Sequence, residues 1–204
     1  MSAEKTIFVV DDDPGVRDSL RVLMESAGYI VRDHDSAKAF LADRTGGGCL
    51  VADIRMPEMD GLELQEEMIR RNMPIPVIVI TGHGDVPLAV RAMKAGAVDF
   101  IEKPFDDEVL LTSIRRALEI GQKTRVKAAE VAAAERLLAL LTPRERNVLD
   151  QLVMGRSNKV AAYELGISPR TVEIHRAHIM DKMNARSLSD LVRIAIAYQS
   201  GPGN

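Results

Sequence analysis

The chain has 204 residues, of which 46% are hydrophobic and 28% are charged, and this composition excludes a disordered protein and leaves room for two domains. The single cysteine, Cys49, excludes an intramolecular disulfide framework and fits a reducing compartment. No apolar run approaches the roughly 18 residues of a membrane span, and the first residues, MSAEK, contain no signal sequence. These features predict a soluble, cytoplasmic protein that does not associate with membranes.

The net charge of -3 is unevenly distributed along the chain. Residues 137–204 contain nine Lys and Arg against six Asp and Glu, so this part is basic and the preceding part is acidic. A basic C-terminal part is typical of a protein that binds a polyanion. An asymmetry of this size arises equally well by chance.

Short β-rich apolar runs alternate with amphipathic helical patterns over the first 120 residues. The predicted strands are 6–10, 29–33, 49–53, 76–81 and 97–102, and the predicted helices are 15–27, 36–43, 61–71, 85–95 and 107–119. Runs such as VIVI are apolar on both faces, as expected of strands covered by helices on each side. The pattern predicts an α/β fold, a five-stranded doubly wound parallel sheet, with a ligand site outside the carboxyl ends of its strands.

The remaining sequence is entirely helical in pattern. Residues 121–137 are rich in Ala, Glu, Lys and Leu and predict a helical linker that continues the fifth helix, with Gly121 as a weak point. Four helical segments follow, and TPRE at 142–145 has the form of a capping box. We therefore expect three parts: an α/β domain at 1–120, a linker at 121–137 and an all-α, four-helix domain at 138–204.

Acidic and basic side chains are expected to meet at the carboxyl edge of the sheet. Asp11, Asp12, Asp53, Thr81 and Lys103 each end a predicted strand or follow one closely. The carboxylates suit Mg²⁺, and together with a hydroxyl and an ammonium group they indicate phosphoryl-transfer chemistry. Asp53, alone at the end of a strand in the middle of the sheet, is the candidate nucleophile. By contrast, Asp13 precedes Pro14 and a helix, so it is expected to be a helix cap.

Four motifs in this half resemble the receiver domain of two-component response regulators: FVVDDD, VADIRMPEMDG, VIVITGHG and VDFIEKPF. The resemblance implies that Asp53 accepts a phosphoryl group from a sensor histidine kinase. It also implies that Asp11, Asp12, Asp53 and the backbone carbonyl of Arg55 hold Mg²⁺.

The same resemblance gives roles to three further residues. Thr81 and Lys103 would contact the phosphoryl oxygens, and Thr81 and Phe100 would form the switch. Taken alone, Phe100 is better explained by core packing. The position of Phe100 three residues before Lys103 favours the switch.

The segment SPRTVEIHRAHIMDKM, residues 168–183, has two unlike faces when its residues are placed about 100° apart around a helix. One face is an apolar stripe, in which His175 is expected to be packed rather than to read bases; its members are Val172, His175, Ile179 and Met183. The other face mixes charged and apolar residues, namely Arg170, Glu173, Ile174 and Ala177. Such a mixture suits a helix that reads bases in the DNA major groove. Arg176 and Lys182 flank this face and either contact phosphates or remain solvated.

Residues 138–200 resemble the LuxR-type helix-turn-helix, whose core here begins at Ser157 and ends at Arg176. A receiver followed by this domain has the arrangement of the NarL/FixJ family, and TGHGDVPLAVRAMKAGAVDFIEKPF is most similar to its FixJ branch. The resemblance implies a FixL-like kinase partner, promoter DNA and RNA polymerase as further partners, control of nitrogen-fixation genes, and a phosphorylated homodimer formed through the face at about 85–105.

The expected function is therefore a phosphorylation-activated transcriptional regulator and not an enzyme. Two alternatives remain open from the sequence. One is a Mg²⁺-dependent aspartyl-phosphate phosphatase, against which there is no cap domain. The other is a constitutive DNA-binding dimer with a receiver that does not switch, against which the set Asp53, Thr81 and Lys103 is intact.

Overall fold

A computed structural model describes residues 5–43, 46–82 and 86–201. The chain divides into two compact units, residues 1–125 and 126–204, and the division falls within one long helix, α5 (Asp107–Leu138). Residues 121–137 are thus helical and continue the fifth helix, as predicted, while the three-part division of the chain stays a prediction. In the described ranges, no helix is both long and apolar enough to cross a membrane.

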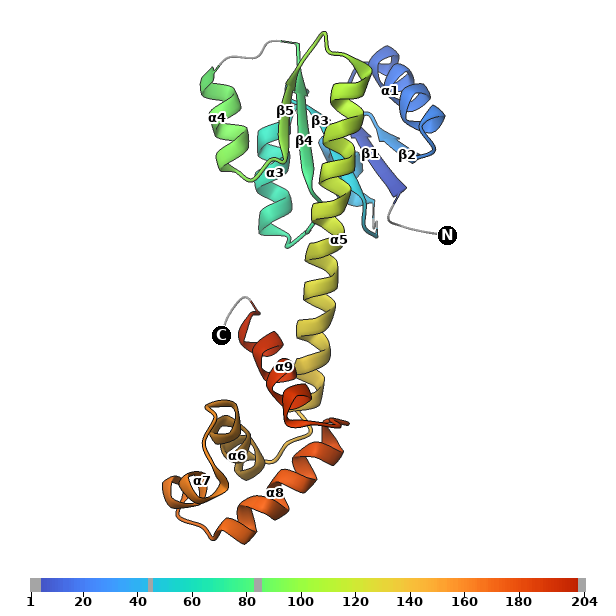
Figure 1. Ribbon diagram of the computed structural model, residues 1–204. Helices are drawn as coiled ribbons and strands as arrows, with labels where there is room; N and C mark the ends of the chain where they lie inside the picture. The colour runs from blue at the N-terminus through green and yellow to red at the C-terminus, as the bar shows by residue number, and fades with distance from the viewer. Residues whose placement is uncertain (1–4, 44–45, 83–85, 202–204) are drawn as a thin grey trace. The chain divides into compact units, whose positions relative to one another are not determined.

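The first unit is built on a parallel sheet (Figure 1). Its strands are β1 (Thr6–Val10), β2 (Ile30–His34), β3 (Cys49–Asp53), β4 (Val77–Thr81) and β5 (Asp99–Glu102). They lie in the order β2-β1-β3-β4-β5, and all neighbouring pairs are parallel. This order confirms the predicted doubly wound sheet and places β3 at its centre.

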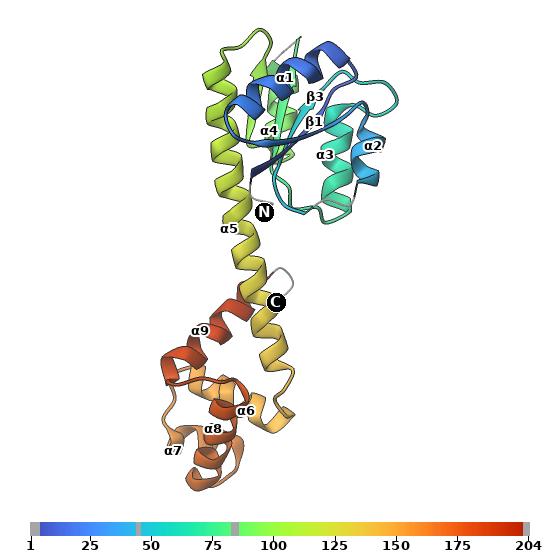
Figure 2. The ribbon, with the colours of Figure 1, turned by 90° about the vertical axis from the view of Figure 1, so that its right-hand side faces the viewer.

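Helices cover both faces of the sheet because alternate strand residues point to opposite sides. One core contains Phe8, Val10, Leu50 and Ala52 and packs against α2 (Ala37–Ala42), α3 (Gly61–Arg70) and α4 (Val86–Lys94). The other contains Ile7, Val9, Cys49 and Val51 and packs against α1 (Pro14–Ser26) and α5. Figure 2 shows α2 beside α3, on the face away from α5. Burial on both faces explains why the inner strands β1, β3 and β4 are almost wholly apolar, whereas the edge strands β2 and β5 also contain charged residues.

Three strands begin later than predicted. β4 begins at Val77 rather than at 76, and β2 and β5 begin later for local reasons. Tyr29 donates its N–H to the carbonyl of Met24 and so completes the turn after α1, which moves β2 to Ile30–His34. Ala97 likewise donates to the carbonyl of Ala92 at the end of α4, and β5 starts at Asp99. Residue 85, at which the predicted fourth helix begins, lies outside the described residues.

Gly121 is a point of close packing within the continuous helix α5. A Cβ atom at this position would lie 3.1 Å from Cδ and Cγ of Pro76. The glycine therefore lets α5 approach the residue that precedes β4, and the helix passes through it without a break.

Cys49 in β3 is fully buried, and burial raises the pKa of its thiol to about 12.

The second unit contains α6 (Pro143–Val153), α7 (Asn158–Leu165), α8 (Pro169–Lys182) and α9 (Leu188–Gln199), which confirms the four predicted helices. Their apolar faces and the end of α5 share one core. Thr142 and Glu145 form the predicted capping box at the start of α6. Gly166 ends α7 in the left-handed conformation, with φ 63°, which an L side chain rarely adopts. Ser168 then caps α8, with Pro169 in its first turn.

Candidate functional site: the carboxyl edge of the sheet and the helix α8

The predicted acidic site lies at one edge of the sheet, because all the strands run in the same direction. Asp53 and Thr81 are the last residues of β3 and β4, while Asp11 and Lys103 directly follow β1 and β5. Asp11 and Asp53 are 2% and 7% exposed, and Thr81 is fully buried. The sequence prediction that these residues converge is thus confirmed for Asp11, Asp53 and Lys103, whose side chains are in contact.

Lys103 joins the two buried carboxylates. Its Nζ lies 2.8 Å from Oδ1 of Asp53 and 3.0 Å from Oδ2 of Asp11. Its backbone N–H donates to the carbonyl of Thr81 at 2.7 Å, so β4 fixes the place at which the lysine leaves the sheet. The next peptide bond, Lys103–Pro104, is cis. One ammonium group therefore serves two negative charges.

Backbone amides hold the remaining oxygen of each carboxylate. The N–H of Arg55 donates to Oδ2 of Asp53 at 2.6 Å, and the N–H of Asp13 donates to Oδ1 of Asp11 at 2.9 Å. The carboxylate of Asp13 points the other way and caps α1 by accepting from Gly15 and Val16. This confirms that Asp13 is a helix cap and leaves Asp11 and Asp53 as the fixed acids of the site.

Burial is the largest influence on the pKa of Asp11. Burial raises the pKa of Asp11, and the nearby charge of Asp53 adds to this effect, while the hydrogen bond from Asp13 and the contact with Lys103 oppose it. Burial also acts to lower the pKa of Lys103, but its hydrogen bonds to Asp53 and Asp11 outweigh that effect and raise it. Lys103 is thus held as a cation, and a buried negative charge remains only partly offset.

The other predicted site residues, Asp12, Arg55 and Phe100, are more exposed than Asp11 and Asp53. Asp12 is exposed beside Asp11, as is Arg55 beside Asp53. Phe100 is half-buried and packs against the core on the α4 face of the sheet. The metal-binding roles of Asp12 and Arg55 and the switch role of Phe100 stay predictions.

Two residues that the sequence interpretation missed support this edge. A Cβ atom at Gly61 would lie 2.3 Å from the carbonyl oxygen of Asp53, so only glycine fits where α3 begins. Arg17 in α1 donates from one guanidinium nitrogen to the backbone carbonyls of Asp11 and Asp12, at 2.8 and 3.1 Å. Gly61 could have been recognised from the sequence, because it is the glycine of the MDG triplet. Nothing in the sequence marks Arg17, because its role depends on a side chain reaching back to the preceding loop.

In the second unit, α8 has the two faces predicted from the sequence. Val172, Ile179 and Met183 are buried and His175 is half-buried, whereas the predicted base-reading residues are all exposed: Arg170, Glu173, Ile174 and Ala177. The two predicted phosphate contacts, Arg176 and Lys182, are less exposed than these residues. Arg176 is half-buried, and Nζ of Lys182 lies 2.7 Å from Oε2 of the buried Glu145. Lys182 thus has a partner within its own unit, and its contact with DNA stays a prediction.

Both units match known families. Residues 7–115 match the response regulator receiver domain, and residues 139–195 match the bacterial regulatory proteins of the luxR family. The transcriptional regulatory protein FixJ of Bradyrhizobium diazoefficiens is 49% identical over 201 residues, which cover 96% of this chain and 97% of that protein. FixJ of Rhizobium meliloti is 50% identical over 199 residues, covering 97% and 98%.

Solved structures agree with these matches. The response regulator StyR has a TM-score of 0.83 and 46% identity, covering 95% of this chain and 98% of that one. Full-length FixJ from B. japonicum has a TM-score of 0.60 and 46% identity, covering 98% and 100%. A receiver and a LuxR-type helix-turn-helix in one chain define a response regulator that acts on transcription, and the chain belongs to the NarL/FixJ family of these proteins. Within that family it is FixJ-like, since its similarity to FixJ extends over nearly the whole chain.

Proposed function

We propose that Asp53 is the phosphoacceptor and that a sensor histidine kinase is the donor. A carboxylate oxygen of Asp53 would attack the phosphorus of a phosphohistidine, so that a P–O bond forms as the P–N bond breaks. The observation that carries this proposal is the bridge from Lys103 to both Asp53 and Asp11. It puts a fixed cation beside the nucleophile, where charge on the phosphoryl oxygens would develop.

Mg²⁺ is the cofactor that fits this site. Asp11, Asp12 and Asp53 offer carboxylate oxygens and Arg55 offers its backbone carbonyl, and these are the hard ligands that Mg²⁺ prefers. The burial that raises the pKa of Asp11 also favours a bound cation. When bound, the ion would neutralise charge on the phosphoryl group, while Lys103 and the Thr81 hydroxyl would contact its oxygens.

Phosphorylation would then alter the face formed by α4 and β5. The added charge would draw Thr81 and Lys103 toward the phosphoryl group, and Phe100 would change its packing with them. An apolar stripe on α4 supports this face as the dimer interface: Val86, Val90 and Met93 recur on one side of the helix and are 77%, 44% and 48% exposed. The proposed face covers about 85–105, of which residue 85 lies outside the described residues.

The output is promoter binding by α8. A dimer would present two α8 helices to half-sites about one turn of DNA apart. The exposed face described above, with Arg170, Glu173, Ile174 and Ala177, would contact base edges, and Arg176 and Lys182 would contact phosphates. The similarity to FixJ supports a FixL-like kinase as partner and nitrogen-fixation genes as targets. RNA polymerase as the recipient of the bound regulator and the cytoplasm as its location are further parts of this proposal.

The decisive experiment treats the protein with acetyl phosphate and Mg²⁺ and measures both intact mass and oligomeric state. We expect one phosphoryl adduct and a dimer for the wild type, and neither for Asp53→Asn. Asp150→Asn, the same change at an exposed position in the second unit, is the matched control and should still form the adduct. An adduct that persists in Asp53→Asn would refute the assignment of the nucleophile. A dimer that forms equally without acetyl phosphate would favour the constitutive regulator, and repeated turnover of a phosphomonoester would favour the phosphatase.

A further inference from the structure

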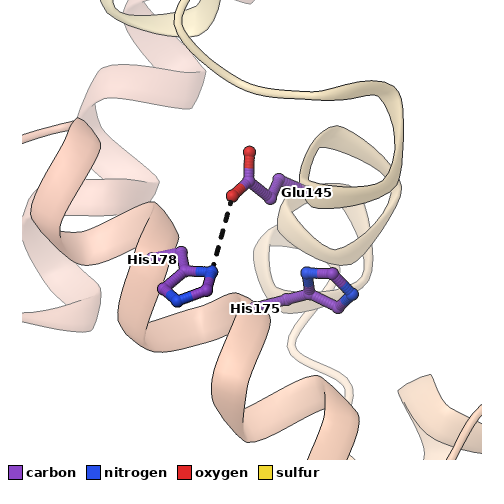
Figure 3. A group of neighbouring side chains, drawn as sticks. All are labelled: Glu145, His175 and His178. Carbon is purple, nitrogen blue, oxygen red and sulfur yellow. Dashed lines mark ion pairs between the residues drawn. The ribbon is translucent and has the colours of Figure 1, made fainter.

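A second cluster of ionisable side chains lies between α6 and α8, in the unit that carries the helix-turn-helix. Glu145 comes from the first turn of α6, while His175 and His178 come from neighbouring turns of α8 (Figure 3). One ligand atom from each of the three, a carboxylate oxygen or a ring nitrogen, can be chosen so that all lie within 4.8 Å of one another. Nδ1 of His178 is 3.9 Å from Oε1 of Glu145.

The two oxygens of Glu145 have different surroundings. Oε2 accepts from the backbone N–H of Thr142 at 2.8 Å, from the Thr142 hydroxyl at 2.9 Å and from the ammonium group of Lys182 at 2.7 Å. Oε1 faces the histidines instead. These contacts fix the carboxylate and at the same time leave one oxygen directed at the two imidazoles.

His175 contributes an observation of its own. Its Nδ1 atom is buried and, among the described residues, has no hydrogen-bond partner. A buried polar atom without a partner is costly and calls for a ligand or a water molecule. Figure 3 shows both imidazoles on the same side of α8, turned toward the space in front of Glu145.

We propose that Glu145, His175 and His178 form a binding site for one transition-metal ion of the Zn²⁺ class. Two imidazoles and one carboxylate are the protein ligands of a tetrahedral Zn²⁺ centre that keeps its fourth position for water. Imidazole ligands select Zn²⁺, Co²⁺, Ni²⁺ or Cu²⁺ over Mg²⁺ and Ca²⁺, which prefer oxygen. The site is therefore chemically distinct from the all-oxygen site at the edge of the sheet.

The geometry needs only side-chain movement to close around an ion. The side chain of His178 is 60% exposed and free to rotate, whereas Glu145 is held by Thr142. Histidines three residues apart on a helix lie on adjacent turns and can share one ion. Because Lys182 places a positive charge on the other oxygen of Glu145, we expect a moderate affinity rather than that of a structural zinc site.

The test uses Co²⁺ as a spectroscopic probe on the full-length protein in the presence of excess Mg²⁺. Four-coordinate Co²⁺ bound through nitrogen absorbs visible light far more strongly than Co²⁺ on carboxylates and water, so the receiver site contributes little to the signal. We expect a saturable absorption with one ion per chain, which Zn²⁺ abolishes by displacing the probe. His178→Gln, at an exposed position, should remove the absorption and leave the far-ultraviolet circular dichroism unchanged.

His34→Gln is the matched control, because His34 lies beside a carboxylate, Asp43, but in the first unit. Its absorption should equal that of the wild type. The proposal is overturned if His178→Gln keeps the full absorption, if His34→Gln loses it, or if the wild type shows no strong absorption with millimolar Co²⁺.

Discussion

Each unit of the molecule contains a buried carboxylate paired with a lysine, and the two pairs are opposite in character. Glu145 receives one hydrogen bond from Lys182 and two from Thr142, and these interactions lower its pKa to about 2. At the sheet edge, Lys103 must serve both Asp11 and Asp53, and burial raises the pKa of Asp11. The first pair is satisfied and stabilises the fold, whereas the second retains unbalanced negative charge.

The difference shows how a carboxylate can be recognised as reactive. A carboxylate oxygen that already accepts its full set of hydrogen bonds is stabilised little by a further ligand on the same atom. A charge that is left partly uncompensated favours whatever cation or electrophile reaches it. This contrast supports the assignment of phosphoryl chemistry to the sheet edge, and it can be tested by substitutions that should act on one pair and not on the other.

The largest effect is expected from Lys103→Met. Removing the ammonium group takes away the fixed cation next to Asp53, and loss of one such electrostatic contact lowers a rate by about 100-fold. The rate of phosphorylation by acetyl phosphate, followed by intact mass, measures this change. Lys182→Met is the control with the same side-chain replacement, and its rate should match that of the wild type. Equal rates for all three proteins would mean that the two lysines do not differ in function.

Glu145→Gln should destabilise the second unit by about 2 kcal/mol, because the buried ion pair with Lys182 is replaced by a weaker hydrogen bond from the ammonium group to a neutral amide. Amide hydrogen exchange of α6 and α8 in the full-length protein measures the change. Asp150→Asn, at an exposed position on the same helix, serves as the control and should stay within about 0.5 kcal/mol of the wild type. Unchanged protection in Glu145→Gln would show that the pair contributes nothing to stability.

The same residue predicts a dependence on pH. The pKa of Glu145 is about 2 in the folded chain, below its ordinary value of 4.5. Its stabilising contribution is therefore fully present above pH 4.5 and is lost as the pH falls toward 2. The difference in unfolding free energy between the wild type and Glu145→Gln should thus be large at pH 7 and smaller at pH 3. A difference that stays constant between these values would contradict the lowered pKa.

The smallest effect, opposite in sign, is expected from Asp11→Asn. Because the pKa of Asp11 is raised by burial, its ionised form at neutral pH costs stability that the neutral amide does not. Asparagine can still accept the hydrogen bond from Asp13, so the first unit should gain about 0.5–1 kcal/mol in the absence of Mg²⁺. Urea unfolding with a chelator present measures this gain. A loss of stability would place Asp11 in the same class as Glu145.

Sequence reasoning predicted the parts of the molecule that depend on local pattern. The inner parallel strands are apolar on both faces, and the caps at Asp13 and Thr142 use side chains close to the helices that they begin, so all of these were predictable. The convergence of Asp11, Asp53 and Lys103 followed from strand direction. The partners of Lys182 and Arg17 did not, because each depends on where a long side chain meets a distant or recessed group.

Gly121 illustrates the same limit. Intrinsic helix propensity marks it as a weak point, yet its lack of a side chain is what admits Pro76 against α5. Propensity describes an isolated helix and contains no information on what packs against it. The cluster of Glu145, His175 and His178 could not be predicted from the sequence either, because it depends on how α6 and α8 cross.

The burial of Cys49 has a practical consequence for labelling chemistry. It is the only cysteine in the sequence, it lies inside the sheet, and a thiol with a pKa of about 12 forms almost no thiolate at neutral pH. The native chain should therefore resist maleimides and nitroxide reagents. Cysteines introduced at exposed positions, one in each unit, would take up probes selectively, and distances between the probes could follow the two units before and after phosphorylation without first removing the native thiol.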